Sequence, residues 1–121
     1  MGRLTTHVLD TAHGVPGAFM RVELYRLDPD GSEAGRSRVA EAITNADGRC
    51  DRPLLEGPAL TASVYELVFH AGDYFAARGL ALPQPRFVDV VALRFGISDA
   101  TQHYHVPLLV SPFAYSTYRG S

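Results

Sequence analysis

The chain of 121 residues has one cysteine, Cys50, and no tryptophan. A single cysteine cannot form a disulfide within the chain, nor can it supply the paired thiolates of a cysteine-based zinc site. The missing tryptophan and second cysteine also count against an immunoglobulin-like interaction domain, whose core is typically built on a Cys–Trp–Cys set.

Neither sign of charge dominates, because 11 Lys and Arg face 13 Asp and Glu for a formal net charge of -2. Nucleic-acid-binding domains usually carry a strong basic excess, so we expect no nucleic-acid partner. Long apolar runs are absent as well: residues 106–110 are a run of five that includes a proline, against the roughly 20 residues of a membrane helix. With no leader-like segment before residue 4, we expect no membrane association and a cytoplasmic location.

The overall composition is that of a folded globular protein. Hydrophobic residues make up 46% and charged residues 20% of the chain, which excludes intrinsic disorder. We find no internal repeat, low-complexity tract or linker, and the length suits one domain. The sequence therefore predicts a single domain over residues 1–121.

Turn clusters rich in Gly, Pro, Asn and Asp divide the chain into segments of about 6 to 11 residues, a length typical of strands. Seven segments show alternating polarity or β-branched and aromatic enrichment: residues 4–10, 19–27, 38–44, 61–70, 87–96, 103–110 and 113–119. A weaker strand is expected at residues 50–55. One short helix is expected at residues 73–78, with Gly72 or Asp73 as N-cap and Gly79 as its stop. The pattern predicts an all-β fold, an antiparallel β-sandwich.

Three of the five histidines have both a structural and a functional interpretation. His7 is either a partly buried residue bonded to the backbone or a general acid or base on a rigid strand. His103 and His105 share a strand face with Cα atoms about 6.5–7 Å apart, and with His7 they form a candidate zinc-ligand set. His13 and His70 are expected to be solvated surface residues.

Arg49 and the C-terminal residues are the other candidates. Arg49 follows the turn at residues 45–48, and its guanidinium suits either solvent or an anionic, carbonyl-rich ligand. Residues 118–121 form a frayed end or, if the strand at 113–119 is docked in a sheet, a fixed group of ring, guanidinium and carboxylate. That strand is apolar and carries little charge, so oligomerisation through its edge is expected.

Four motifs together resemble those of the 5-hydroxyisourate hydrolases, the enzymes related to transthyretin. The motifs are LTTHVLDTA at residues 4–12, TNADGR at 44–49, HYHVPLLVSP at 103–112 and YRGS at 118–121. They occur in the family's order, and YRGS matches the tetrapeptide that separates the hydrolases from the hormone-carrying transthyretins.

The resemblance implies a transthyretin-like sandwich of two four-stranded sheets with one short helix. It also implies a homotetramer with active sites at the dimer–dimer interface. The implied reaction is hydrolysis of 5-hydroxyisourate to 2-oxo-4-hydroxy-4-carboxy-5-ureidoimidazoline in urate catabolism, without metal or organic cofactor.

Transferred by motif, the implied site residues are His7, Arg49, His105, Tyr118, Arg119, Gly120 and Ser121. Hydrolysis of a cyclic amide needs an activated water, a stabilised oxyanion and a proton for the leaving nitrogen. We assign His7 as principal base, Arg49 to substrate and oxyanion binding, and His105 to positioning water or returning the proton. Residues 118–120 would hold the flat ring, and the Ser121 carboxylate would orient a histidine or the water.

Two alternatives to a metal-free hydrolase remain at this point. A transthyretin-type carrier of a small aromatic ligand would share the strand pattern, although His7, Arg49 and His105 suit a hydrophobic channel poorly. A metal-dependent hydrolase would use His7, His103 and His105. His103 itself is left outside the core site, as a cleft, supporting or surface residue.

Overall fold

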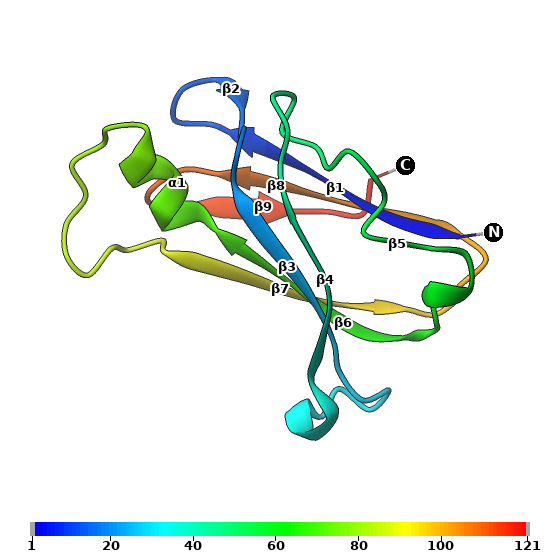
Figure 1. Cartoon of the computed structure of the whole chain (residues 1–121). Coiled ribbons are helices and arrows are strands. Elements are labelled where there is room, and N and C mark those ends of the chain that lie inside the picture. The colour runs from blue at the N-terminus through cyan, green and yellow to red at the C-terminus, as the bar shows by residue number, and fades with distance from the viewer. Residues whose placement is uncertain (1, 121) are drawn as a thin grey trace.

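In the computed structural model, which describes residues 2–120, two β-sheets pack face to face and a short helix lies at one end (Figure 1). The first sheet has the order β2-β1-β8-β9, with β5 also pairing with β1, and the second has the order β4-β3-β6-β7. The first sheet contains β1 (Arg3–Asp10), β2 (Val15–Pro16), β5 (Leu55–Glu56), β8 (His103–Val110) and β9 (Tyr115–Thr117). The second contains β3 (Arg21–Arg26), β4 (Ser37–Ile43), β6 (Ser63–His70) and β7 (Val90–Ile97).

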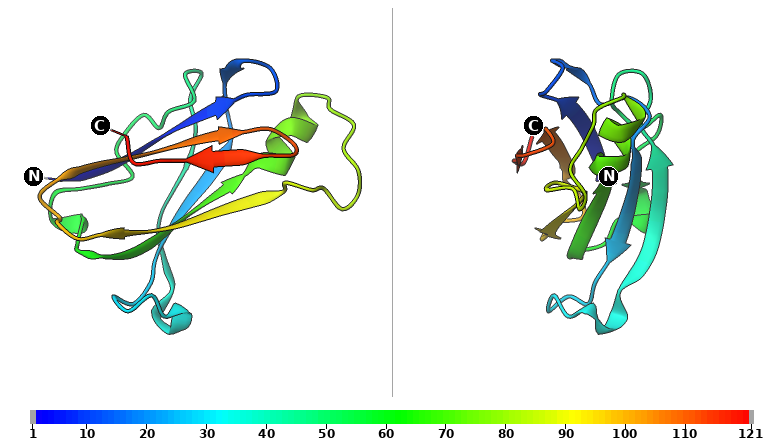
Figure 2. Two further views of the ribbon diagram at one scale, coloured as in Figure 1. Left: turned by 180° about the vertical axis from the view of Figure 1, so that it is seen from behind. Right: turned by 90° about the vertical axis from the view of Figure 1, so that its left-hand side faces the viewer.

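The predicted all-β sandwich with one short helix is confirmed, and two details differ from the prediction. Strands β1 and β8 are parallel, so the first sheet is mixed rather than purely antiparallel. The short β5 adds a fifth strand to that sheet. The end-on view in Figure 2 shows the two layers with the loops and the helix around them.

Several boundaries also differ from those predicted. The strand expected at residues 50–55 is reduced to β5, and β2 was not predicted. Helix α1 (Ala71–Ala77) begins earlier than expected, and its N-cap His70 makes no side-chain capping bond. The predicted stop is correct, because Gly79 follows the C-cap with φ of 87°, a conformation that glycine adopts without strain. Two single-turn 3₁₀ helices, η1 (Glu33–Gly35) and η2 (Gly57–Ala59), complete the elements. No helix among residues 2–120 has the length and apolar character needed to cross a membrane.

Period-two alternation in β1 and β8 assigns one face of the first sheet to the core. Leu4 and Val8 of β1 are fully buried, and the predicted inward set of β8 is confirmed. That set is Tyr104, Val106, Leu108 and Val110. Because successive side chains of a strand point to opposite faces, the residues between these project outward. The outer face of the two strands therefore carries Arg3, Thr5, His7, His103 and His105.

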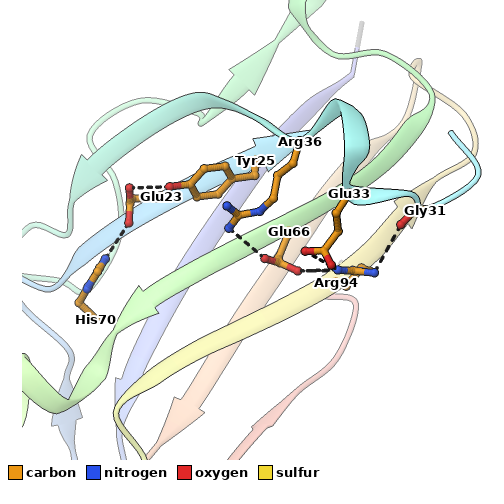
Figure 3. Close-up of polar contacts among 8 residues, drawn as sticks. All are labelled: Glu23, Tyr25, Gly31, Glu33, Arg36, Glu66, His70 and Arg94. Atoms are coloured by element: carbon orange, nitrogen blue, oxygen red, sulfur yellow. Dashed lines mark hydrogen bonds and ion pairs between the residues drawn. The ribbon is translucent and has the colours of Figure 1, made fainter. Parts of the chain in front are cut away.

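The outer face of the second sheet holds a network of charged residues around two buried carboxylates (Figure 3). Glu23 accepts hydrogen bonds from Tyr25 and Arg38 and pairs with Nε2 of His70 at 2.7 Å. Glu66 lies against Arg36 and Arg94. The prediction that His70 is a solvated surface residue is therefore wrong.

The prediction that His13 is a surface residue in a turn is confirmed, because the residue is exposed, but its ring is also bonded to a buried carboxylate. Its Nδ1 lies 2.7 Å from Oδ2 of Asp10, and Tyr74 donates to the same oxygen at 2.8 Å. Asp10 is 1% exposed. Buried carboxylates require such partners, because an unpaired buried charge is costly. His13 and Tyr74 therefore stabilise the end of β1.

Candidate functional site

The parallel pairing of β1 with β8 brings two distant segments of the chain into one site. In its register, Arg3 lies opposite His103 and Thr5 opposite His105. The Thr5 hydroxyl lies 2.7 Å from Nδ1 of His105 and 3.1 Å from Nε2 of His103. Both histidines of the strand face are thus bound to the neighbouring strand through one side chain.

The turn that precedes Arg49 is fixed by its own asparagine. Asn45 Oδ1 accepts from the backbone N–H of Asp47 at 2.9 Å and of Arg49 at 3.1 Å. Gly48 has φ of 75° and packs so closely on β1 that a Cβ would collide with the Val8 carbonyl. The backbone N–H of Val8 donates to the Gly48 carbonyl at 2.8 Å. Local turn chemistry and a close backbone approach together hold this loop against β1.

His7 faces this loop from the middle of β1. It forms an isolated β-bridge with Arg49, and its Nε2 lies 3.0 Å from the carbonyl oxygen of Asp47. Because a carbonyl oxygen only accepts, Nε2 carries the hydrogen and Nδ1 keeps its lone pair. The structural interpretation of His7, a half-buried histidine bonded to the backbone, and its role as a base are therefore compatible.

Burial and the nearby guanidinium favour the neutral forms of two histidines. The pKa of His7 lies below its ordinary value because of burial and then the Arg49 charge, which outweigh the hydrogen bond to the Asp47 carbonyl. The pKa of His105 is lowered by burial, then by Arg49, His7 and His103. A neutral imidazole accepts a proton, so both residues are competent bases at neutral pH.

A cavity of about 340 Å³ opens beside these residues. Its walls include Thr5, Arg49, His103 and His105, together with Cys50 and Asp51. Ligand sites typically start at about 300 Å³, so a small heterocycle fits. His7 does not line this cavity directly but lies on the same outer face of β1 as Thr5. His103, left outside the core site by the sequence, lines the cavity.

The C-terminal residues divide between this site and another part of the surface. The backbone N–H of Gly120 donates to the His105 carbonyl at 2.7 Å. The Arg119 guanidinium stacks 4.0 Å over the Tyr104 ring and donates to the His103 carbonyl at 3.2 Å. Tyr118 is 59% exposed and lines a separate hollow next to Arg119 and Tyr104. The structure thus brings Gly120 to His105 and leaves Tyr118 away from the cavity, while Ser121 lies outside the described residues.

Sequence reasoning missed Thr5 and Arg3 as site residues. Thr5 and Arg3 stand two and four residues before His7 on β1, so they share its face, and this alternation is the signal that indicates them. The metal-ligand alternative finds no support in the geometry. Among residues 2–120, no three His, Cys, Asp or Glu side chains lie close enough together to hold a metal ion.

Residues 4–120 match the model of the HIUase/Transthyretin family. The chain belongs to this family. Its resemblance to the 5-hydroxyisourate hydrolases is also confirmed by overall similarity. A protein of Pseudomonas aeruginosa named 5-hydroxyisourate hydrolase is 59% identical over 121 residues, which cover 100% of this chain and 93% of that protein.

Solved structures of the HIUase/Transthyretin family and related folds superpose closely on this chain. The 5-hydroxyisourate hydrolase of Klebsiella pneumoniae is 33% identical with a TM-score of 0.80, covering 100% of both chains. Sea bream transthyretin in complex with thyroxine is 26% identical with a TM-score of 0.83, covering 98% of this chain and 94% of that one. An (S)-allantoin synthase is 48% identical with a TM-score of 0.92. The match covers 99% of this chain and 44% of that one.

Proposed function

We propose that the chain hydrolyses 5-hydroxyisourate to 2-oxo-4-hydroxy-4-carboxy-5-ureidoimidazoline, an enzymatic step in urate catabolism. The observation that carries the proposal is the convergence of His7, Arg49 and His105, from three distant segments, beside one small cavity. The identity to named hydrolases supports the same reaction. Residues 1–121 act as one hydrolase domain, and the reaction takes no metal or organic cofactor. A cytoplasmic location of the protein stays a prediction.

The reaction assigns a separate task to each of these side chains. His7 takes a proton from water through its free Nδ1, and the hydroxide forms a bond to the ring carbonyl carbon. Arg49 stabilises the negative charge that develops on the carbonyl oxygen. The ring carbon–nitrogen bond then breaks, and the proton that His7 took from water passes to the leaving nitrogen; His105 either positions the water or relays this proton. Arg119 and Gly120 help to hold the flat ring, and the Ser121 carboxylate orients a histidine or the water.

The active protein is proposed to be a homotetramer whose sites lie at the dimer–dimer interface. Strand β9 lies at the edge of the first sheet, so its outer backbone groups are available to another chain. Large apolar side chains are exposed nearby, with Phe87 at 78%, Phe113 at 62% and Tyr115 at 50%. Tyr118 lies away from the cavity of its own subunit, which suits a binding role in a neighbouring site.

A transthyretin-type carrier is the second candidate, because the fold resembles transthyretin bound to thyroxine. The cavity walls decide against it. They bring together Arg3, Arg49, His103 and His105, and a carrier of an apolar aromatic ligand needs mostly apolar walls.

An ultraviolet assay tests the proposed reaction directly. Urate oxidase generates 5-hydroxyisourate in situ, and the decay of its absorbance is followed with and without EDTA-treated protein. We expect acceleration that His7→Ala and Arg49→Ala each reduce by about 10²–10⁴-fold. Arg38→Ala, on the other sheet, is the matched control and should keep near-normal kcat.

Two results would contradict the proposal. If the folded protein fails to accelerate the decay, hydrolysis is rejected and binding of thyroxine becomes the next measurement. If His7→Ala keeps near-normal kcat, the reaction stands but His7 is not the base.

A further inference from the structure

The Thr5 side chain has a place in the site that the mechanism above does not use. Its hydroxyl lies between two imidazole rings, 2.7 Å from Nδ1 of His105 and 3.1 Å from Nε2 of His103. These two nitrogens are the hydroxyl's only hydrogen-bond partners among residues 2–120. Thr5 is also half-buried and lines the cavity.

The neighbouring Thr6 shows what a purely structural threonine looks like in the same strand. It points to the core, is 2% exposed, and donates to the backbone carbonyl of Val106 at 2.7 Å. Thr5 makes no such bond to the backbone. Its hydrogen-bonding capacity is directed entirely at histidine side chains of the site.

The single hydroxyl hydrogen of Thr5 limits how the two histidine rings can be bonded. A hydroxyl has one hydrogen to donate, so it cannot donate to both rings at once. When Thr5 donates to His105, it accepts from the His103 N–H; when it accepts from His105, its hydrogen is free for His103. The facing nitrogens of the two rings therefore cannot both lack a hydrogen while both stay bonded to Thr5, and this couples their proton positions.

The other groups that face His105 do not replace this bond. Arg49, His7 and His103 act on it through their charges, and all three lower its pKa. The backbone of Gly120 is held at the His105 carbonyl rather than at its ring nitrogens. Within the part of the chain that the structure describes, Nε2 of His105 has no hydrogen-bond partner, so this nitrogen is available for substrate or water.

We propose that Thr5 is a positioning residue for the hydrolytic site: its hydroxyl fixes the ring orientation and the proton position of His105, and it links His103 to that histidine. The inference rests on the proposed function for its catalytic consequence. The tautomer of a histidine is commonly set by the partner of its second nitrogen. His103 thus acts on the reaction through Thr5.

Kinetics of two Thr5 variants test the role. Thr5→Val keeps the shape and removes the hydroxyl, whereas Thr5→Ser keeps the hydroxyl. We expect Thr5→Val to lower kcat by about 10- to 100-fold and to shift the acid limb of the pH profile. Thr5→Ser should restore most of kcat and the original limb, and the midpoint of thermal unfolding should stay near that of the unchanged protein in both variants.

The inference is overturned if Thr5→Val keeps kcat and the pH profile, or if Thr5→Ser loses as much activity as Thr5→Val. In the second case the methyl group, and so packing, would be responsible.

Nitrogen NMR of the histidine rings tests the same inference without any substrate. In the unchanged protein, His105 should show one dominant tautomer near neutral pH, and Thr5→Val should give a mixture. His103→Phe should change the tautomer of His105 when Thr5 is present, whereas in the Thr5→Val background only the smaller effect of losing the His103 charge should remain. An identical response in both backgrounds would refute the link. These spectra need no turnover. A protein that does not hydrolyse 5-hydroxyisourate would therefore refute the proposed function, and the spectra would still show whether Thr5 sets the tautomer of His105.

Discussion

Replacing Gly120 by alanine should disable the site through a displacement of less than one ångström. A Cβ on Gly120 would lie 2.7 Å from Cδ2 of the His105 ring, where ordinary van der Waals contact begins at 3.4 Å. The backbone cannot easily retreat, because Gly120 N–H is bonded to the His105 carbonyl at 2.7 Å. The ring cannot easily turn either, because Thr5 holds its Nδ1.

The required shift is about 0.7 Å, the difference between these two distances. A misplacement of about 1 Å in an active site costs on the order of 10²-fold in rate. We therefore expect Gly120→Ala to lower kcat by about 10- to 100-fold. The fold should be little affected, because the new methyl group lies beside the chain end and not in the core.

The ultraviolet assay of 5-hydroxyisourate decay measures this change, with thermal unfolding as the check on folding. Gly96→Ala is the matched control, since a Cβ at Gly96 would have no atom within 4 Å. Near-normal kcat for Gly120→Ala would refute the reasoning, because it would mean that the chain end moves freely away from His105. A large drop in the unfolding midpoint would assign the residue to stability instead.

Two further predictions concern pH and stability. Since the pKa values of His7 and His105 are lowered, the acid limb of kcat/KM should have its midpoint below about 6.5; a limb above 7 would contradict the neutral-base assignment. Glu23→Gln should destabilise the fold by about 1–3 kcal/mol near neutral pH, because His70 and Arg38 lose a buried charged partner. The His70 hydrogen bond, then those of Tyr25 and Arg38 and the charge of Arg21, lower the pKa of Glu23 from 4.5 to about 2 against the opposing effect of burial. The ionised carboxylate therefore stabilises the fold above pH 4.5, and this contribution is lost as the pH falls towards 2. The difference in unfolding midpoint between the variant and the unchanged protein should shrink across that window, and a constant difference would exclude ionisation as its cause.

The strands of the sandwich were largely predictable because alternation in polarity is a local signal. In β8, for example, Tyr104, Val106, Leu108 and Val110 are buried as the sequence predicts, although Pro107 between them is buried as well. Short pairings were not predictable: β2 and β5 have two residues each and depend on β1 being in place. The start of α1 was also missed, because His70 begins the helix without a side-chain cap.

The candidate site was predicted in its residue types more than in its arrangement. The motifs singled out His7, Arg49 and His105, and the structure places them together. Thr5 was overlooked because a threonine in a strand is ordinary, and only its two histidine contacts distinguish it. His70 was misjudged for a similar reason, since its partner Glu23 comes from another strand.

The sequence alone determined which side chains of each strand face the core, where the tight turns fall, and which family motifs the chain carries. These features depend on period-two alternation, on the backbone preferences of Gly and Asn, and on residue identity. Only the tertiary structure decided that β1 runs parallel to β8, with Thr5 beside His105. Alternation fixes the face of a strand but neither its neighbour nor its register, because these depend on how the whole core packs.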